Sequence, residues 1–127
     1  MTKINDKLQY SESHEWVKVE DNLATIGISD HAQSLLGDLV YIELPELQSE
    51  ITLGKEIAVV ESVKAASDVY APISGKVIAV NDALTQTPAL MNEDPYDKGW
   101  LCQLELNNPE ELKGLLDAKA YHDAIGE

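Results

Sequence analysis

The sequence predicts a mainly β fold with a few short helices. Two segments, 15–20 and 23–28, alternate apolar and polar residues on either side of Asp21 and Asn22, which is the pattern of a β-hairpin. A second pattern of strand, turn and strand lies at 59–70. An internal repeat adds further strands of the same kind. Helical patterns are short by comparison, so strands should form most of the core.

A short helix is predicted directly after the first hairpin. Ser29 and Asp30 offer an N-cap for residues 31–36, and Gly37 is the residue type that commonly ends a helix. Residues 39–44 are rich in β-branched and aromatic side chains, and they are predicted to form the next strand.

The last third of the chain predicts one strand and a C-terminal helical segment at about 108–126. Residues 99–106 have a strand pattern, whereas residues 88–95 favour irregular structure with one helical turn. Asn108, followed by a proline and two acids, is a typical helix start. A second terminal helix, packed on the sheet, is predicted from residues that share one helical face: Ala118, Tyr121 and Ile125.

Length and composition predict a single domain, 1–127, that folds alone. Hydrophobic residues make up 44% of the chain, and no apolar run approaches the roughly 18 residues of a membrane span. The start lacks the features of a secretory or transit peptide. We therefore expect a soluble protein with no membrane contact, cytoplasmic in a bacterium, or mitochondrial if this is a processed eukaryotic form. The single cysteine, Cys102, rules out an intrachain disulfide and fits a reducing compartment.

The charge of the chain argues against nucleic acid as a partner. The formal net charge is −14, and all nine basic residues are lysines. A phosphate backbone needs clustered basic residues, and arginine is the residue that usually clamps small anions. The acidic surface favours basic surfaces on larger proteins, although solubility alone is an alternative explanation of the charge.

No catalytic or metal-binding pattern stands out. The sequence has no nucleophile elbow, no phosphate-cradling glycine loop and no zinc-type spacing. The histidines His14, His31 and His122 are scattered along the chain, and each is interpreted as a surface or capping residue. Cys102 lies on the apolar face of its strand, so we expect a buried and unreactive thiol.

One lysine lies between the two halves of an internal repeat. Segments 54–61 and 75–82 share Gly-Lys-x-Ile-Ala-Val at five positions, although two valine-rich strands can also agree by chance. Between them, small and turn-forming residues at 64–68 predict a hairpin with Lys64 at its tip. Such a lysine can be merely solubilising. Acidic neighbours disfavour a Schiff-base role, because they stabilise the charged amine, so the pattern favours a lysine that is recognised and modified.

Five motifs together resemble the H-protein family of the glycine cleavage system, whose members are lipoyl carriers. The resemblance covers nearly the whole chain, in the order and spacing of the family. It implies a lipoyl/biotinyl-type flattened barrel-sandwich hybrid with short added helices, including the C-terminal segment. Biotin is disfavoured, because Val63 and Ala65 stand where biotinyl domains usually carry methionine. The motifs are SHEW at 13–16, DHAQSLLGD at 30–38, ESVKAASD at 61–68, APISG at 71–75 and PYDKGW at 95–100.

The resemblance implies a non-catalytic carrier subunit with lipoate bound covalently to Lys64. Lipoate ligase or a lipoyl/octanoyl transferase would attach it. The carrier would take the aminomethyl group from glycine decarboxylase (P protein) to aminomethyltransferase (T protein), and reducing equivalents to dihydrolipoyl dehydrogenase (L protein). The alternative is a relay that donates lipoyl groups for modifying other proteins outside glycine catabolism.

The resemblance also implies roles for side chains around Lys64. Glu61, Ser67 and Asp68 are candidates for recognition by the attaching enzyme. Ser13, Glu15 and Asp68 are candidates for a surface cleft that shelters the loaded arm, where carboxylates would pair with its amine. The alternative is that Ser13 and Glu15 only begin a strand and Asp68 only shapes a turn.

Overall fold

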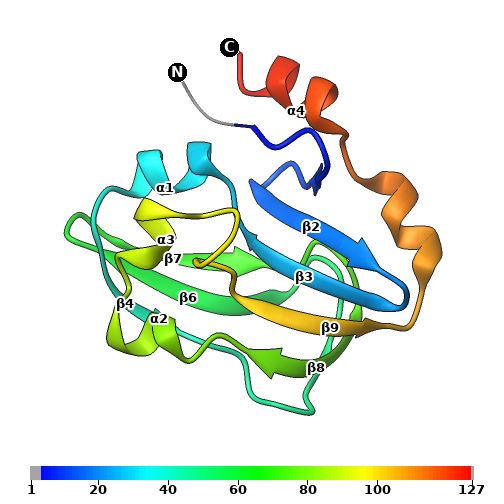
Figure 1. Ribbon diagram of the computed structural model, residues 1–127, viewed down its shortest axis with the longest axis horizontal. Helices are drawn as coiled ribbons and strands as arrows, with labels where there is room; N and C mark the ends of the chain where they lie inside the picture. The colour runs from blue at the N-terminus through cyan, green and yellow to red at the C-terminus, as the bar shows by residue number, and fades with distance from the viewer. Residues whose placement is uncertain (1–3, 127) are drawn as a thin grey trace.

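Two antiparallel sheets form the body of the protein, as the computed structural model of residues 4–126 shows (Figure 1). The larger sheet has the order β1-β2-β3-β9-β8-β5, and the smaller has the order β4-β6-β7. The predicted mainly β architecture is therefore confirmed, while residues 1–3 and 127 of the predicted domain lie outside the described part. The strands are β1 (Gln9–Tyr10), β2 (Glu15–Glu20), β3 (Leu23–Ile28), β4 (Leu39–Glu43), β5 (Glu50–Ile51), β6 (Glu56–Ser62), β7 (Ala66–Tyr70), β8 (Gly75–Val80) and β9 (Cys102–Leu106).

The apolar sides of the two sheets enclose the main core. Alternation along β2 and β3 buries Val17 and Ile26, and these residues belong to one apolar cluster with Val60 of β6 and Leu104 of β9. Cys102 also lies in this cluster, fully buried, as the sequence predicts. Burial of side chains from both sheets therefore fixes the position of the smaller sheet on the larger one.

The two repeat segments form β6 and β8, one in each sheet. Their registers shift at the same point of the repeat, between Glu56 and Ala58 in β6 and between Val77 and Ala79 in β8. A β-bulge bends a strand and increases its local twist. The shared sequence is thus accompanied by a shared backbone irregularity, which argues against chance similarity.

The hairpin that carries Lys64 has a shorter turn than predicted. Strand β6 continues to Ser62 and β7 begins at Ala66, so Ser67 and Asp68 belong to the strand and not to the turn. The ladder pairs Val60 with Ser67 and Val59 with Asp68. Small and polar residues disfavour a strand only weakly, and cross-strand pairing overrides that preference here.

In the described part of the chain, four short α-helices and one 3-10 helix surround the sheets: α1 (Asp30–Leu36), α2 (Ala83–Gln86), α3 (Leu90–Glu93), η1 (Pro109–Gly114) and α4 (Ala118–Ala124). The predicted helix after the first hairpin is confirmed as α1, with its N-cap at Ser29. The predicted helical turn within 88–95 is α3. The sequence did not indicate α2, β1 or β5, which are too short for a clear periodicity.

The C-terminal segment differs from the prediction in its first half. Residues after Asn108 form the 3-10 helix η1, and the Asn108 side chain makes no capping hydrogen bond. Helix α4 packs against β1, at the edge of the larger sheet, where Tyr121 stacks on Tyr10 with ring centroids 4.3 Å apart. In Figure 1, η1 and α4 are the orange and red coils that follow β9. Within residues 4–126, none of the helices has the length and apolar character needed to cross a membrane.

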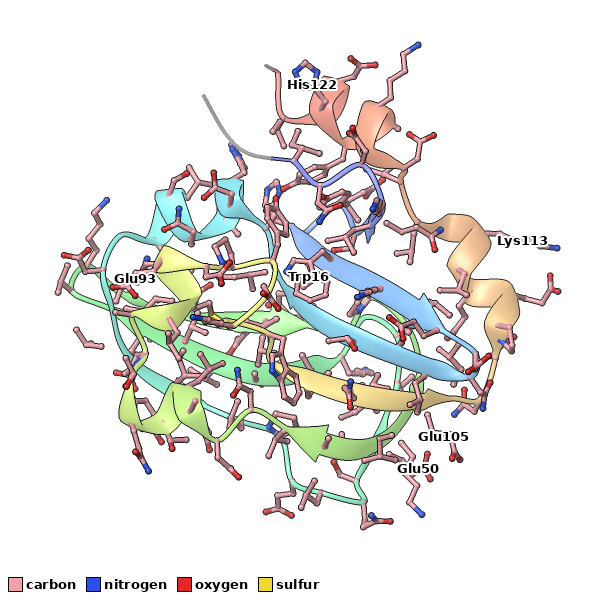
Figure 2. All side chains as sticks on the ribbon, in the orientation of Figure 1. Trp16, Glu50, Glu93, Glu105, Lys113 and His122 are labelled. Carbon is pink, nitrogen blue, oxygen red and sulfur yellow. The ribbon has the colours of Figure 1, made fainter. Side chains whose placement is uncertain are left out.

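The strand predicted at 99–106 begins only at Cys102. Gly99 packs its backbone against α3, where an added Cβ would come within 2.8 Å of the Met91 Cα. Just before it, Pro95 accepts a hydrogen bond of 2.9 Å from the indole N–H of Trp16. Trp16 projects from β2 toward this connection (Figure 2). Residues 95–100 thus connect β2 to α3, through the hydrogen bond of Trp16 and the packing of Gly99.

Gly75→Ala is expected to lower the free energy of unfolding by about 2–3 kcal/mol, as overpacking does. An added Cβ at Gly75 would lie 2.5 Å from the Glu105 carbonyl oxygen, a backbone atom that cannot move without disturbing the pairing of β8 with β9. Urea denaturation measures the effect. Gly114→Ala is the matched control, because nothing lies within 4 Å of its added Cβ, and it should change stability by less than about 0.5 kcal/mol. Equal stability of the two variants would contradict this prediction.

Candidate functional site

Lys64 lies on an exposed hairpin whose backbone is held on both sides. The Ser62 hydroxyl accepts hydrogen bonds from the backbone N–H groups of Lys64 (3.1 Å) and Ala65 (3.2 Å). On the other side, the Val63 N–H donates to the Asp38 carbonyl at 3.0 Å, which ties the tip to the connection between α1 and β4. The lysine side chain therefore extends from a fixed point of the surface.

The Lys64 side chain lies over Gly37, at the end of α1. A Cβ built on Gly37 would be 3.3 Å from the Lys64 Cε and 3.6 Å from its Nζ. Gly37 has φ of 83°, in the left-handed region, so its lack of a side chain serves both the end of the helix and the passage of the lysine. The amine is thus placed beside α1.

A cleft of about 150 Å³ lies between α1 and β7. It contains all three residues predicted for a cleft, Ser13, Glu15 and Asp68, together with Ser67. The third recognition candidate, Glu61, does not line it; this residue is half-buried on β6, where it pairs with Tyr41 and Ala66. The rest of the cleft wall is mainly apolar, from Ile28, Ala32, Leu35, Leu36, Val60 and Val69.

Glu15 is a buried carboxylate with hydroxyl donors and no cation. Its side chain is 2% exposed, and its Oε1 accepts hydrogen bonds of 2.5 Å from both Ser11 and Ser13. Within residues 4–126, no ion pair includes it. Burial raises the pKa of Glu15, while these hydrogen bonds and one from the backbone of Tyr70 act in the opposite direction. Among the described residues, hydroxyl and backbone N–H groups are thus the partners of this carboxylate, and no cation is.

Two of the three histidines, which are scattered along the sequence, are neighbours in the fold. The rings of His14 and His31 lie 4.9 Å apart, centroid to centroid, and His14 also lines the cleft. Burial and the neighbouring His31 lower the pKa of His14, so its imidazole is neutral at pH 7 and leaves the charge of Glu15 unmatched. His122 points outward from α4 (Figure 2). No group of three metal-ligating side chains occurs in the part of the chain described.

Helix α4 is connected to the cleft through Tyr121. Its hydroxyl lies 2.9 Å from the His14 Nδ1 and 2.6 Å from the Ser29 Oγ. Ser29 in turn caps α1, because its Oγ accepts from the Ala32 N–H. The contacts of Tyr121 with His14 and Ser29 join residues 107 and 92 positions apart, so no local pattern in the sequence indicates them. The role of Ser11, four residues before Glu15, was not predicted either.

Cys102 takes no part in this site. Its side chain is fully buried, and burial raises the pKa of the thiol to about 12. The thiolate, which is the nucleophilic form, is therefore a minor species at neutral pH.

Comparisons with known proteins agree on one family. The family model described as Glycine cleavage H-protein matches residues 8–127. Two relatives bear the name Glycine cleavage system H protein. The one from Stenotrophomonas maltophilia is 57% identical over 126 residues, which cover 98% of this chain and 96% of the relative. The one from Photorhabdus laumondii is 52% identical over 128 residues, which cover 100% and 98%.

A solved structure is similar over the same extent. The crystal structure of a glycine cleavage system H protein from Mycobacterium marinum has a TM-score of 0.89 and 33% sequence identity, and the match covers 98% of this chain and 100% of that one. Similarity of sequence and of architecture therefore extends over almost the whole molecule.

Proposed function

Because the chain belongs to the glycine cleavage H-protein family, we propose that it is a single lipoyl-carrier domain with lipoate attached as an amide to the side-chain nitrogen of Lys64. Family membership supports the carrier role in glycine cleavage. The carrier takes the aminomethyl group from glycine decarboxylase to aminomethyltransferase, and passes reducing equivalents to dihydrolipoyl dehydrogenase. One observation supports this most: an exposed lysine on a rigid hairpin lies beside a cleft that holds an unmatched buried carboxylate.

The residues around Lys64 fit lipoate. When bound, lipoate supplies a disulfide that opens and closes by thiol exchange. The hairpin supplies an exposed amine, a backbone fixed by Ser62, and space above Gly37. Lys18 and Lys113, by contrast, form ion pairs with carboxylates at 3.2 and 2.8 Å.

The cleft lies within reach of an arm on Lys64. Ser67 to Val69 follow Lys64 by three to five residues, so they lie at most about 10–17 Å away, at a rise near 3.3 Å per residue for a fully extended chain. Extended lipoyl-lysine has a comparable length, about 14 Å from roughly eleven bonds. The apolar wall excludes water, and the carboxylates of Glu15 and Asp68 provide charge for an ammonium group.

We assign Glu61, Ser67 and Asp68 to recognition by lipoate ligase or a lipoyl/octanoyl transferase. These residues lie on the two strands that lead to the tip, and Ser67 and Asp68 are exposed. An enzyme that reacts with the unmodified amine must come within one lysine length of the backbone, so it contacts these strands directly.

The chain itself is assigned no catalytic step. The cleft residues bind, orient and exclude water, and the reactions belong to lipoate and the partner enzymes. The relatives named above are bacterial, which supports a place in the bacterial cytoplasm. The relay role outside glycine catabolism has no observation of its own in its favour.

Reconstitution tests this function. The lipoylated chain, mixed with the three partner enzymes, glycine, tetrahydrofolate and NAD, should support NADH formation, while the unmodified chain should not. Transfer of the lipoyl group to an acceptor domain is followed by mass spectrometry in a parallel reaction. Lipoyl transfer without NADH formation would replace the cycle by the relay role.

A further inference from the structure

The connection between α1 and β4, residues 37–39, supports the tip of the Lys64 hairpin from outside the hairpin. Gly37 lies under the lysine side chain, with a Cβ built there 3.3 Å from the Lys64 Cε. The Asp38 carbonyl accepts a 3.0 Å hydrogen bond from the N–H of Val63, the residue before the lysine. Whatever fixes this connection therefore also fixes the direction in which Lys64 leaves the surface.

The side chain of Asn92 binds this connection at both ends. Its Oδ1 accepts a hydrogen bond of 2.9 Å from the Leu39 N–H, and its Nδ2 donates to the Gly37 carbonyl at 2.9 Å. The same Nδ2 donates to the Gln33 Oε1 of α1 at 3.0 Å. Because a backbone N–H can only donate and a carbonyl can only accept, these partners fix which end of the amide is oxygen. One planar amide thus spans the bend from α1 into β4.

Asn92 projects from an anchored element. It lies on α3 directly after Met91, which is fully buried in the main core. The backbone of Gly99 packs on the same turn, where an added Cβ would come within 2.8 Å of the Leu90 carbonyl oxygen. Helix α3 lies beside α1 (Figure 1). The position of α3 therefore determines the position of residues 37–39.

The same hydrogen bonds hold one wall of the cleft in place. Through Gln33 and the Gly37 carbonyl, Asn92 is bonded to α1, and α1 supplies Ala32 and Leu35 to the apolar wall. Asn92 itself does not line the cleft, so it acts through these residues. The base of the arm and the wall on which the arm lies are thus held by one side chain. Freedom at the base would lower the effective concentration of the arm at the cleft.

We propose that Asn92 is a positioning residue, which aims the lipoyl-lysine at the cleft by holding residues 37–39. This inference rests on the proposed function. Loss of the Asn92 amide should leave the hairpin folded, because the Ser62 hydroxyl still binds its turn. The tip and its lysine should, however, move more freely relative to α1, and the loaded arm should be less well sheltered.

Hydrogen exchange followed by NMR tests the hold on the tip. In Asn92→Ala, the Val63 amide should lose its protection about tenfold, the effect of one net hydrogen bond, because its acceptor on Asp38 is no longer fixed. The Ser62 amide, which donates to the Ala65 carbonyl at 2.9 Å within the hairpin, should keep its protection. Unchanged protection of the Val63 amide would overturn the proposal.

Asn81→Ala is the matched control for a general loss of stability. The Asn81 amide also binds backbone, donating to the Lys98 and Trp100 carbonyls at 2.8 Å each, but it holds residues 98–100 and not 37–39. It should lower the midpoint of urea unfolding as Asn92→Ala does, while the Val63 amide keeps its protection. Equal loss of that protection in the two variants would assign Asn92 to general stability and overturn the proposal.

The lifetime of the aminomethyl-loaded chain tests the consequence for the arm. Lipoylated Asn92→Ala should release formaldehyde and ammonia about fivefold faster than the wild type, the size of effect expected of a residue that acts through others. Asn81→Ala should release them at the wild-type rate. A wild-type lifetime of loaded Asn92→Ala would overturn the proposal.

A second variant keeps the test independent of a cavity at position 92. The carboxylate of Asn92→Asp has the shape of the amide and still accepts from the Leu39 N–H, but its second oxygen faces two acceptors, the Gly37 carbonyl and the Gln33 Oε1. It should reproduce both effects of Asn92→Ala, and wild-type behaviour would overturn the proposal. Failure of the wild-type lipoylated chain to take up an aminomethyl group would instead refute the proposed function, and exchange of the Val63 amide would still decide whether Asn92 holds the tip.

Discussion

Lys64→Arg is expected to abolish lipoate attachment and, with it, all glycine oxidation that depends on this chain. Amide formation needs a neutral amine as nucleophile, and an arginine guanidinium stays protonated in proteins. The substitution keeps the positive charge and a similar length, so the side chain still passes over Gly37 and the hairpin bonds of Ser62 are unaffected. A loss is therefore chemical and not a failure to fold.

Intact and peptide mass spectrometry of protein made in lipoate-supplied cells measures this result. The wild type should gain one lipoyl mass on the peptide that contains Lys64, and Lys64→Arg should gain none. Lys55→Arg is the matched control, because Lys55 is an exposed lysine just before β6, the other end of the same strand. A lipoyl mass that persists in Lys64→Arg, or is lost in Lys55→Arg, would move the attachment site elsewhere.

The fold was predictable where the information is local. The β2–β3 hairpin, helix α1 with its Ser29 cap, and the Lys64 hairpin each follow from alternation, caps or turn residues within about fifteen positions. The limits of the Lys64 turn were wrong, because strand pairing with β6 overrides the weak preference of Ser67 and Asp68.

The cleft was predictable only in part, because its parts are far apart in the sequence. The resemblance to a family pointed to Ser13, Glu15 and Asp68, and folding gathers them in one cleft. No local pattern indicated the 2.9 Å contact of His14 with Tyr121, which joins residues 107 positions apart.

Glu15→Gln is expected to remove a pH dependence of stability. Burial raises the pKa of Glu15 in the folded chain, so the folded state still holds this proton at pH values where the unfolded state, with a pKa near 4.3, has released it. The contribution of Glu15 to the free energy of unfolding is therefore full below about pH 4 and is lost as the pH rises through the raised folded pKa. Urea denaturation across this range should show the decline in the wild type and not in Glu15→Gln.

The same substitution should shorten the lifetime of the aminomethyl-loaded chain about tenfold at pH 7, the loss of one charge-assisted contact in a cleft with little water. The cost of ionising buried Glu15 is offset only when a cation arrives beside it, so the carboxylate favours the loaded arm and the amide does not. Release of formaldehyde and ammonia from the loaded chain measures this lifetime.

Glu20→Gln, the same change at an exposed position of β2, is the control and should have no effect. Asp68→Asn should have a smaller effect, because solvent screens its exposed charge. If the cleft acts through charge, the difference between wild type and Glu15→Gln disappears below the pKa of Glu15; a difference that persists there would assign the role to shape and not to the carboxylate.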